Sequence, residues 1–505
     1  MRRRPRPCWM NWHCSATRCG RFERTPPVTP NRHPVPARGQ QDGRARKTLI
    51  EGVTLVSMDR NIGVVRGASV LVEGDLIGAV GPSPLLRPDD TVDEVVDGRG
   101  FILFPGLVNA HMHTWQTALR GIASNWTLLE YFRHTHAGLA TFFTAEDIYV
   151  GTFAGALNQL NCGTTTLVDW CHNNPTPEHT DAAVTALEHS GIRAAFLHGS
   201  PKPEPRPGQR PYWEVPQPRP EIERLAAQPR FGANRLLSLG LAALGPHYST
   251  LEVALADFRL AQDMGLSISV HQGGGAAHVP EGWTHLEKAG LLGPHANIVH
   301  GNDLSDEQLA AFVDLGVSFS LTPENEMTQG HGHPITGRLR NFGASPSIGI
   351  DLESGLSGEL LFAARIALVH QRALDNAAFR AAALSKPHIP ETSTLTTLDA
   401  LRWITVEGAR MLGQEERIGS ISPGKQADLL LIDARQPNMQ PVHDPVNAIL
   451  MQASLANIHS VMVAGTWRKR AGALVDDGGR PLDTTAWLDP LRKSGERLAA
   501  AVQRS

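Results

Sequence analysis

Two histidines separated by one residue, His111 and His113, lie at the end of an apolar stretch that runs from Phe101 to Thr114. Alternate side chains of a strand leave on the same face, so both imidazoles are predicted to point the same way. Imidazole nitrogen is a preferred ligand of zinc and similar divalent metals. The pair therefore predicts part of a metal site whose other ligands come from elsewhere in the chain.

More polar residues follow short apolar runs further along the chain. The residues at or just after the ends of these runs are Asp169, His198, His247, His271, His300 and Asp351. If the runs are parallel strands of a barrel, their carboxyl ends meet at one rim, where such barrels carry their chemistry. One histidine at a strand end is commonly structural, but so many on successive strands indicate a shared site.

The elements that would position these residues are strands alternating with helices. Strands are predicted at 164–170, 192–198, 236–243, 267–271, 296–300, 316–321 and 347–351, and the opening stretch makes eight. Helical patterns lie between them, for example at 144–161 and 250–265. This alternation predicts an α/β fold with a parallel (β/α)8 TIM-like barrel.

The two ends of the chain have a different texture, with short apolar runs separated by turn residues. We expect residues 47–104 and 415–480 to build one small β-sandwich domain together, with the barrel at 105–414 inserted between them. Residues 481–505 are predicted to form a helical tail. Residues 1–46, rich in arginine and proline, are predicted to be a disordered basic extension.

The composition of the chain limits the classes of partner that we expect it to bind. Eleven arginines lie within residues 1–47, so the rest of the chain has an excess of acidic side chains, which argues against a nucleic-acid partner. No stretch approaches the roughly 20 apolar residues of a membrane helix. Five cysteines without a regular framework fit a reducing cytoplasm. We expect a cytoplasmic protein with a small-molecule substrate.

Several stretches resemble the metal-dependent amidohydrolase superfamily, in particular its cytosine deaminase-like and triazine hydrolase-like branch. They are PGLVNAHMHTWQTALRGI, SVHQGG, NIVHGNDLSDEQL, SIGIDLESGLSGELL and ALRWITVEGARMLGQEERIGSISPGKQADLLLID. The resemblance implies a metallo-barrel with a composite β-sandwich, and metal ligands at His111, His113, His271 and Asp351. It also implies a homo-oligomer, the common state of such relatives.

The ligand set suits one divalent ion, Zn²⁺ or Fe²⁺. Some relatives hold two metals through a carboxylated lysine on strand four, but residues 236–246 contain no lysine. The implied mechanism is attack by hydroxide generated at the metal, with Asp351 accepting the proton and His300 stabilising charge. The predicted enzyme hydrolyses a non-peptide C–N bond in a small amide, cyclic amide or amino-substituted heterocycle. Hydrolytic dechlorination or removal of another leaving group from a triazine-like ring is one alternative, and a non-catalytic metal-holding protein is another.

One position departs from the resemblance. Deaminases of this branch place a proton-donating glutamate three residues after the histidine of strand five, where this chain has Gly274. Asp351 could carry the proton from water to the leaving group, Glu324 or Glu326 could replace the glutamate, or the chain could hold metal without turnover. We expect the first two, and Glu326 is therefore included among the candidate catalytic residues.

Four residues are predicted to contact substrate. Trp115 and Gln116 follow the histidine pair closely, Glu324 lies in a long loop at 322–346, and His247 resembles a substrate-contacting histidine of relatives. The alternatives are a core aromatic for Trp115 and a structural histidine for His247. A second long loop, at 199–222, contains eight prolines and is either a binding loop or a surface insertion.

Overall fold

The computed structural model describes residues 40–41, 44–85, 90–382 and 389–502. Eight strands form a parallel sheet in chain order, with every neighbouring pair parallel. They are β8 (Leu107–Met112), β9 (Thr164–Cys171), β10 (Arg193–Gly199), β11 (Leu237–Ala243), β12 (Ser267–Gln272), β13 (Ala296–His300), β14 (Ser318–Leu321) and β15 (Ser347–Ile348). The predicted α/β barrel is confirmed.

The barrel closes between its first and last strands. A parallel bridge joins Met112 to Asp351. The Asp351 amide donates to the carbonyl oxygen of His111 at 3.0 Å, and the His113 amide donates to the carbonyl oxygen of Asp351 at 2.7 Å. Gly349 permits this approach, because a Cβ there would lie 2.5 Å from the His111 carbonyl oxygen. Closure therefore brings two predicted metal-binding segments together.

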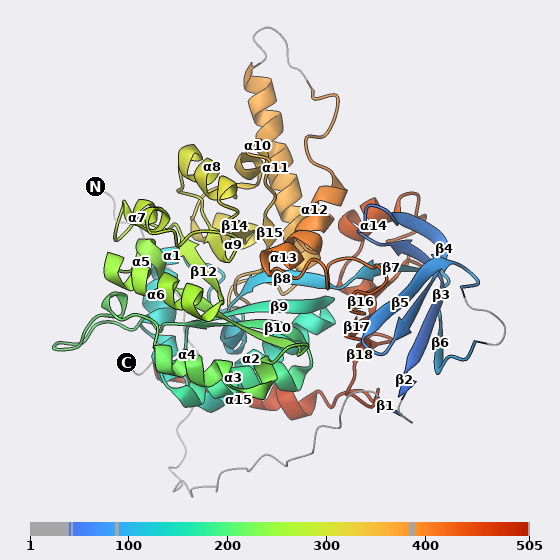
Figure 1. Ribbon diagram of the computed structural model, residues 1–505, viewed down its shortest axis with the longest axis horizontal. Coiled ribbons are helices and arrows are strands. Elements are labelled where there is room, and N and C mark those ends of the chain that lie inside the picture. Colours follow the sequence, from blue (N-terminus) through green and yellow to red (C-terminus); the bar gives the residue numbers. More distant parts are fainter. Residues whose placement is uncertain (1–39, 42–43, 86–89, 383–388, 503–505) are drawn as a thin grey trace, which may run out of the picture.

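Helices cover the outside of the barrel (Figure 1). The outer helices are α2 (Ala145–Asn161), α3 (Pro177–Ser190), α4 (Arg219–Ala226), α6 (Leu251–Met264), α7 (Gly282–Lys288), α8 (Asp306–Asp314), α10 (Thr336–Asn341), α11 (Leu360–Ala382), α12 (Thr397–Trp403) and α13 (Val406–Met411). Several begin where the sequence offers a cap: Thr144 and Asp147 form a reciprocal capping box at α2, and Ser305 and Gln308 form one at α8.

Short helices occupy the connections at the rim. They are η1 (Thr114–Leu119), α1 (Leu128–Tyr131), η2 (Phe132–His136), η3 (Leu139–Phe142), η4 (Tyr212–Glu214), α5 (Gly245–Tyr248) and α9 (Pro323–Gln329). A further short helix, η5 (Pro229–Phe231), lies in the connection from α4 to β11, at the opposite end of the barrel. The segment 322–346, expected to be a long loop, thus contains α9 and α10. Pro323 begins α9 at a position that suits proline, and Gly330 ends it in the left-handed conformation, with φ 88°.

The small domain is one mixed sheet of nine strands from both ends of the chain, as predicted. Its strands are β3 (Lys47–Val56), β4 (Val64–Glu73), β5 (Leu76–Pro82), β6 (Glu94–Asp97), β7 (Phe101–Pro105), β16 (Leu429–Asp433), β17 (Ile458–Val463), β18 (Thr466–Arg470) and β19 (Ala473–Leu474). α14 (Pro445–Met451) and η6 (Leu455–Asn457) connect β16 to β17. In Figure 1 the blue and red strands of this sheet lie together beside the barrel.

The predicted opening strand is divided between the two sheets. β7 pairs with β16 in the small sheet, whereas β8 belongs to the barrel, and Gly106 separates them. A buried ion pair also joins the two regions: the Arg193 side chain on β10 donates to both carboxylate oxygens of Asp428, at 3.0 and 3.1 Å. The barrel and the small sheet are therefore joined by both covalent and ionic links.

Described elements near both ends of the chain are one helix and one pair of short strands. At the end, α15 (Thr485–Val502) packs on α2, where the Ser494 hydroxyl donates to Asp147 at 2.6 Å. At the start, β1 (Gln40–Gln41) and β2 (Arg44–Ala45) pair antiparallel, inside the range predicted to be disordered. Residues 1–39 and 42–43 of that predicted extension lie outside the described residues. Among the described residues, no helix combines the length and apolar character needed to cross a membrane.

Candidate metal centre and its cavity

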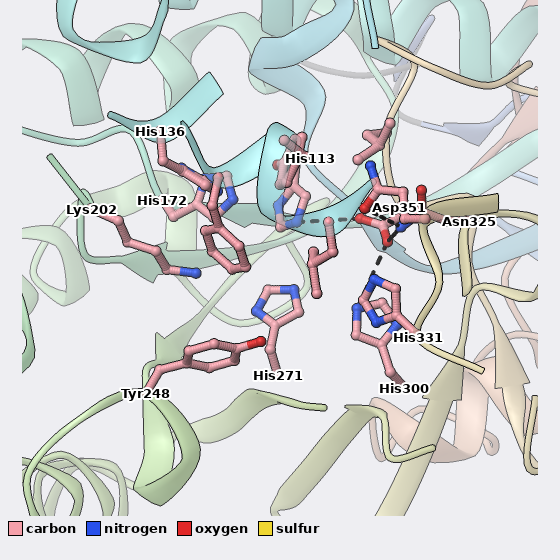
Figure 2. A pocket seen from close by; sticks show the side chains of 15 residues that line it. His113, His136, His172, Lys202, Tyr248, His271, His300, Asn325, His331 and Asp351 are labelled. Carbon is pink, nitrogen blue, oxygen red and sulfur yellow. Dashed lines mark hydrogen bonds and ion pairs between the residues drawn. The ribbon is translucent and has the colours of Figure 1, made fainter. Parts of the chain in front are cut away.

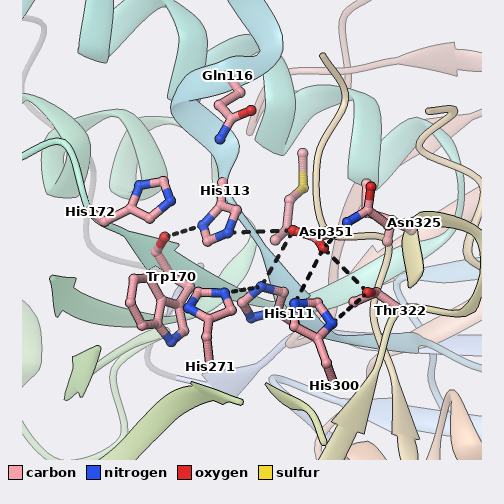
Figure 3. Close-up of polar contacts among 12 residues, drawn as sticks. His111, His113, Gln116, Trp170, His172, His271, His300, Thr322, Asn325 and Asp351 are labelled. Carbon is pink, nitrogen blue, oxygen red and sulfur yellow. Dashed lines mark hydrogen bonds and ion pairs between the residues drawn. The ribbon is translucent and has the colours of Figure 1, made fainter. Parts of the chain in front are cut away.

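Three imidazoles and one carboxylate converge at the carboxyl ends of the barrel strands (Figure 3). His111 lies in β8, His113 follows it, His271 lies in β12 and Asp351 follows β15. The ligand atoms of the three histidines all lie within 4.8 Å of one another. Asp351 Oδ1 is 3.6 Å from His111 Nε2 and 3.4 Å from His113 Nε2. The predicted ligand set therefore comes together at one point.

The spacing of these atoms fits a divalent ion. Tetrahedral zinc with nitrogen ligands at about 2.0–2.1 Å places neighbouring ligand atoms about 3.4 Å apart. The Nε2 atoms of His111 and His271 are 3.2 Å apart, close to that separation. His113 Nδ1 donates to the carbonyl oxygen of Trp170 at 2.6 Å, which fixes the tautomer and leaves its Nε2 lone pair toward the centre.

Burial sets the charge of these groups. Burial lowers the pKa of His113 to about 3, and it also lowers the pKa of His111 and His271, so these imidazoles are neutral ligands at neutral pH. Burial alone would raise the pKa of Asp351, but the neighbouring imidazoles of His111 and His300 outweigh it and hold the pKa below its usual value. The centre thus presents neutral nitrogens and an ionised carboxylate.

A second set of side chains fixes Asp351 and His300. Asp351 Oδ2 accepts hydrogen bonds from Asn325 Nδ2 at 2.6 Å and from the Thr322 hydroxyl at 3.2 Å. His300 Nε2 lies 3.8 Å from the same oxygen. His300 and Asp351 have φ values of 67° and 69°, a strained conformation for non-glycine residues that is commonly found at functional sites.

Glu326 lies behind His300. Its side chain is fully buried, with Oε1 3.4 Å from His300 Nδ1 and accepting from the Thr322 amide at 2.8 Å. Glu324 is partly buried on the same helix, and burial raises its pKa. Neither carboxylate lines the cavity next to the centre. Glu326 is therefore placed to act through His300.

The centre opens into a cavity that is lined by side chains from the strand ends and the rim connections (Figure 2). Of the predicted residues, His113, His271, His300 and Asp351 line it. His331, from the segment 322–346 that was predicted to be a loop at this rim, lines it too. The other lining residues were not predicted from the sequence, and they are Leu128, Tyr131, Phe132, His136, His172, Lys202, Tyr248, Asn325, Gln329 and Leu352. Most come from rim connections without strand periodicity. His172 could have been predicted from the sequence, because it lies two residues after Trp170 and continues the alternation of β9.

Three of the predicted substrate contacts lie behind this lining, as partners of other side chains. Trp115 Nε1 donates to His172 at 3.1 Å, Gln116 Nε2 donates to the Tyr131 hydroxyl at 2.5 Å, and Gln272 Nε2 donates to His247 at 3.1 Å. All three are buried. Direct contact of Trp115, Gln116, His247 or Glu324 with substrate stays a prediction.

The space beyond Gly274 is filled. A Cβ built there would lie 2.2 Å from Leu128 Cδ2 and 3.2 Å from the Tyr248 hydroxyl, and the backbone has φ +92°. The Tyr248 hydroxyl donates to the carbonyl oxygen of Gly273. A glutamate at this position would require both the backbone and Leu128 to move.

Known proteins resemble this chain in sequence and in structure. A deaminase of 5-methylthioadenosine and S-adenosylhomocysteine from Symbiobacterium thermophilum is 27% identical over 439 residues, which cover 83% of this chain and 92% of the relative. A 5'-deoxyadenosine deaminase from Methanothermobacter thermautotrophicus is 27% identical, covering 82% of this chain and 91% of that one.

Solved structures share the fold. An adenosine deaminase from Xanthomonas campestris with bound zinc superposes with a TM-score of 0.75 at 23% identity, covering 90% of this chain and 99% of that one. Atrazine chlorohydrolase from Arthrobacter aurescens, complexed with zinc, gives 0.71 at 22%, covering 90% and 100%. The amidohydrolase family model matches residues 102–468. The chain therefore belongs to the amidohydrolase family, which confirms the predicted hydrolase of non-peptide C–N bonds.

Proposed function

We propose that this chain holds one divalent metal ion and hydrolyses a C–N bond in a small amide, cyclic amide or amino-substituted heterocycle. The observation that carries the proposal is the convergence of His111, His113, His271 and Asp351 at a cavity that three of them line. Deaminases among its relatives support removal of an amino group from a ring. Within the described part of the chain, these histidines are also the one group of three or more metal-ligating side chains so closely spaced.

Each residue of the site has a separate role in the proposed hydrolysis. A bound divalent ion would supply a Lewis acid that lowers the pKa of water at the site. Asp351, ionised and held by Asn325 and Thr322, accepts a proton from the attacking water. His300 is held by Glu326 through Nδ1 and directs its Nε2 toward the same region, 3.8 Å from Asp351 Oδ2. The water oxygen then forms the new C–O bond as the C–N bond breaks.

The leaving nitrogen needs a proton. Gly274 offers no donor, and Glu324 and Glu326 do not line the cavity. Asp351 lies in the lining and gains a proton in the first step, so it is placed to pass that proton to the leaving nitrogen. In this route the Asp351 carboxyl group takes the proton from the water and gives it to the leaving nitrogen, so no second acid is needed.

The lack of a proton donor at Gly274 favours a second candidate function, which is hydrolytic removal of chloride from a triazine-like ring. Chloride leaves as an anion without needing a proton, so the absence of a donor at Gly274 costs this reaction nothing. The chlorohydrolase of similar fold is consistent with this alternative.

The test is turnover by metal-loaded protein. The purified full chain is loaded with Zn²⁺ or Fe²⁺ and incubated with amides, aminopyrimidines, adenosine-type nucleosides and chlorotriazines, and ammonia, amine and chloride are measured. We expect nitrogen release with about one metal ion per chain. Chloride release alone would favour the second candidate, and no turnover by metal-replete protein would favour a non-catalytic metal-holding protein. Two tightly held ions per chain would contradict the single-metal assignment.

A further inference from the structure

Lys202 extends from the proline-rich segment after β10 into the cavity. Its side chain is buried, with 7% exposure, and it lines the same cavity as the metal ligands. Its ammonium nitrogen lies 5.4 Å from the ring centre of Phe132, 5.6 Å from that of Trp170 and 5.2 Å from that of Tyr248. Figure 2 shows Lys202 and Tyr248 at one side of the cavity and Asp351 at the other.

The ammonium of Lys202 has no hydrogen-bond acceptor or ion-pair partner within the part of the chain that the structure describes. The three aromatic faces attract a cation, but they do not replace the hydrogen bonds that water provided. Lys469, another buried lysine, donates to the carbonyl oxygen of Asn161 at 2.8 Å. A buried ammonium normally has such a partner, so the missing partner of Lys202 indicates a place for a ligand atom.

The other charges around the cavity leave this position open to an anion. Asp351 is the one carboxylate in the lining, and it already interacts with His111, His113, Asn325 and Thr322. Burial lowers the pKa of five lining histidines, His113, His136, His172, His271 and His331, so they carry no charge at neutral pH. The sixth lining histidine, His300, already has Glu326 as its partner. Lys202 is therefore the lining group that can offer an unshared positive charge.

We propose that the Lys202 ammonium binds a carboxylate or an equivalent anionic oxygen group of the substrate, held across the cavity from the bond that is hydrolysed. The rings of Phe132 and Tyr248 line the cavity beside the ammonium, with their centroids 5.8 Å apart, and favour a flat ring that carries this group. This inference rests on the proposed function and adds a substrate class to it, namely small cyclic acids. A direct measurement of ligand binding tests this inference separately from the proposed function, because binding needs no turnover.

The probe is the pair benzoate and benzamide, which match in shape and differ in charge. Binding of each to the full chain is measured by calorimetry at pH 7, with and without loaded zinc. We expect benzoate to bind more tightly by about tenfold or more, the gain of one charge-assisted hydrogen bond. Equal affinity for the two ligands, or no binding of benzoate, overturns the inference. Turnover of neutral C–N substrates together with equal affinity would overturn it and leave the proposed function standing.

Two variants locate the anion. Lys202→Met keeps the aliphatic stem against the rings and should abolish the preference for benzoate, whereas Lys202→Arg should retain it. Lys288→Met, the same change at an exposed helix position, should leave the preference unchanged. A preference that survives in Lys202→Met, or that occurs only with zinc and in all variants, would place the anion at the metal and overturn the inference. The comparison of the two ligands on the unmodified chain stands even if a variant fails to fold.

Discussion

The buried charged groups at the two ends of the cavity differ in the number of polar partners that the protein gives them. At the metal end, formed by His111, His113, His271 and Asp351, the carboxylate has partners on both oxygens. At the lysine end, formed by Phe132, Trp170, Lys202 and Tyr248, the ammonium faces rings and has no acceptor among the described residues. Under the two proposals above, the protein itself arranges the reaction at one end, and the substrate supplies the missing partner at the other.

The largest expected effect tests the metal end. In the proposed mechanism Asp351→Asn removes the proton acceptor and one metal ligand, so kcat should fall by about 10³-fold or more and metal content should drop. Steady-state kinetics and elemental analysis measure both. Asp314→Asn, an exposed position on α8, is the matched control and should leave both unchanged. Substantial turnover by Asp351→Asn would remove Asp351 from the mechanism.

Glu326→Gln tests whether the metal end depends on the buried partner of His300. The amide still accepts from the Thr322 amide but no longer offers a charged partner to His300, so kcat should fall about 10- to 100-fold with KM little changed. The pH profile should shift as well, which a merely structural role would not cause. Glu307→Gln, at an exposed position on α8, is the control, and equal effects of the two variants would contradict the role given to Glu326.

Gly274→Ala tests whether the space beside the lysine end is filled. The new Cβ would meet Leu128 on a backbone with positive φ, so the free energy of unfolding should fall by about 1–3 kcal/mol. Urea denaturation measures it. Leu128→Ala added to Gly274→Ala should cost less than the sum of the two single changes, because it relieves the contact. Strictly additive effects would mean that Leu128 does not limit this position.

The smallest expected effect is the pH dependence of binding at the lysine end. Burial lowers the pKa of Lys202 from 10.5 to about 8, with Asp351 acting weakly in the opposite direction. Anion binding requires the ammonium, so it is fully available below pH 8 and lost as the pH rises through that value. Benzoate affinity should fall about tenfold between pH 7 and pH 9. Calorimetry across this range checks it, and a flat profile would mean that Lys202 does not bind the anion.

The metal end could be predicted from the sequence and the lysine end could not. His111, His113, His271 and Asp351 each follow a β-type run, and parallel strands bring such ends to one rim whatever the loops do. Phe132, Lys202 and Tyr248 come from three rim connections whose paths depend on packing rather than on periodicity. The structure divides the Phe101–Thr114 stretch between two sheets at Gly106, close to the domain boundary predicted between residues 104 and 105. The homo-oligomer and the cytoplasmic location stay predictions.

The closure of the barrel gives the metal end a mechanical consequence. β15 has two residues, and the bridge between Met112 and Asp351 joins the last strand segment to the first. An ion held by His111 and Asp351 would connect chain positions about 240 residues apart, in the manner of a cross-link that closes a long loop. Its binding energy then becomes folding energy. Chelation should therefore loosen the barrel first along β8 and β15, and hydrogen exchange of their amides would report the loss before global unfolding does.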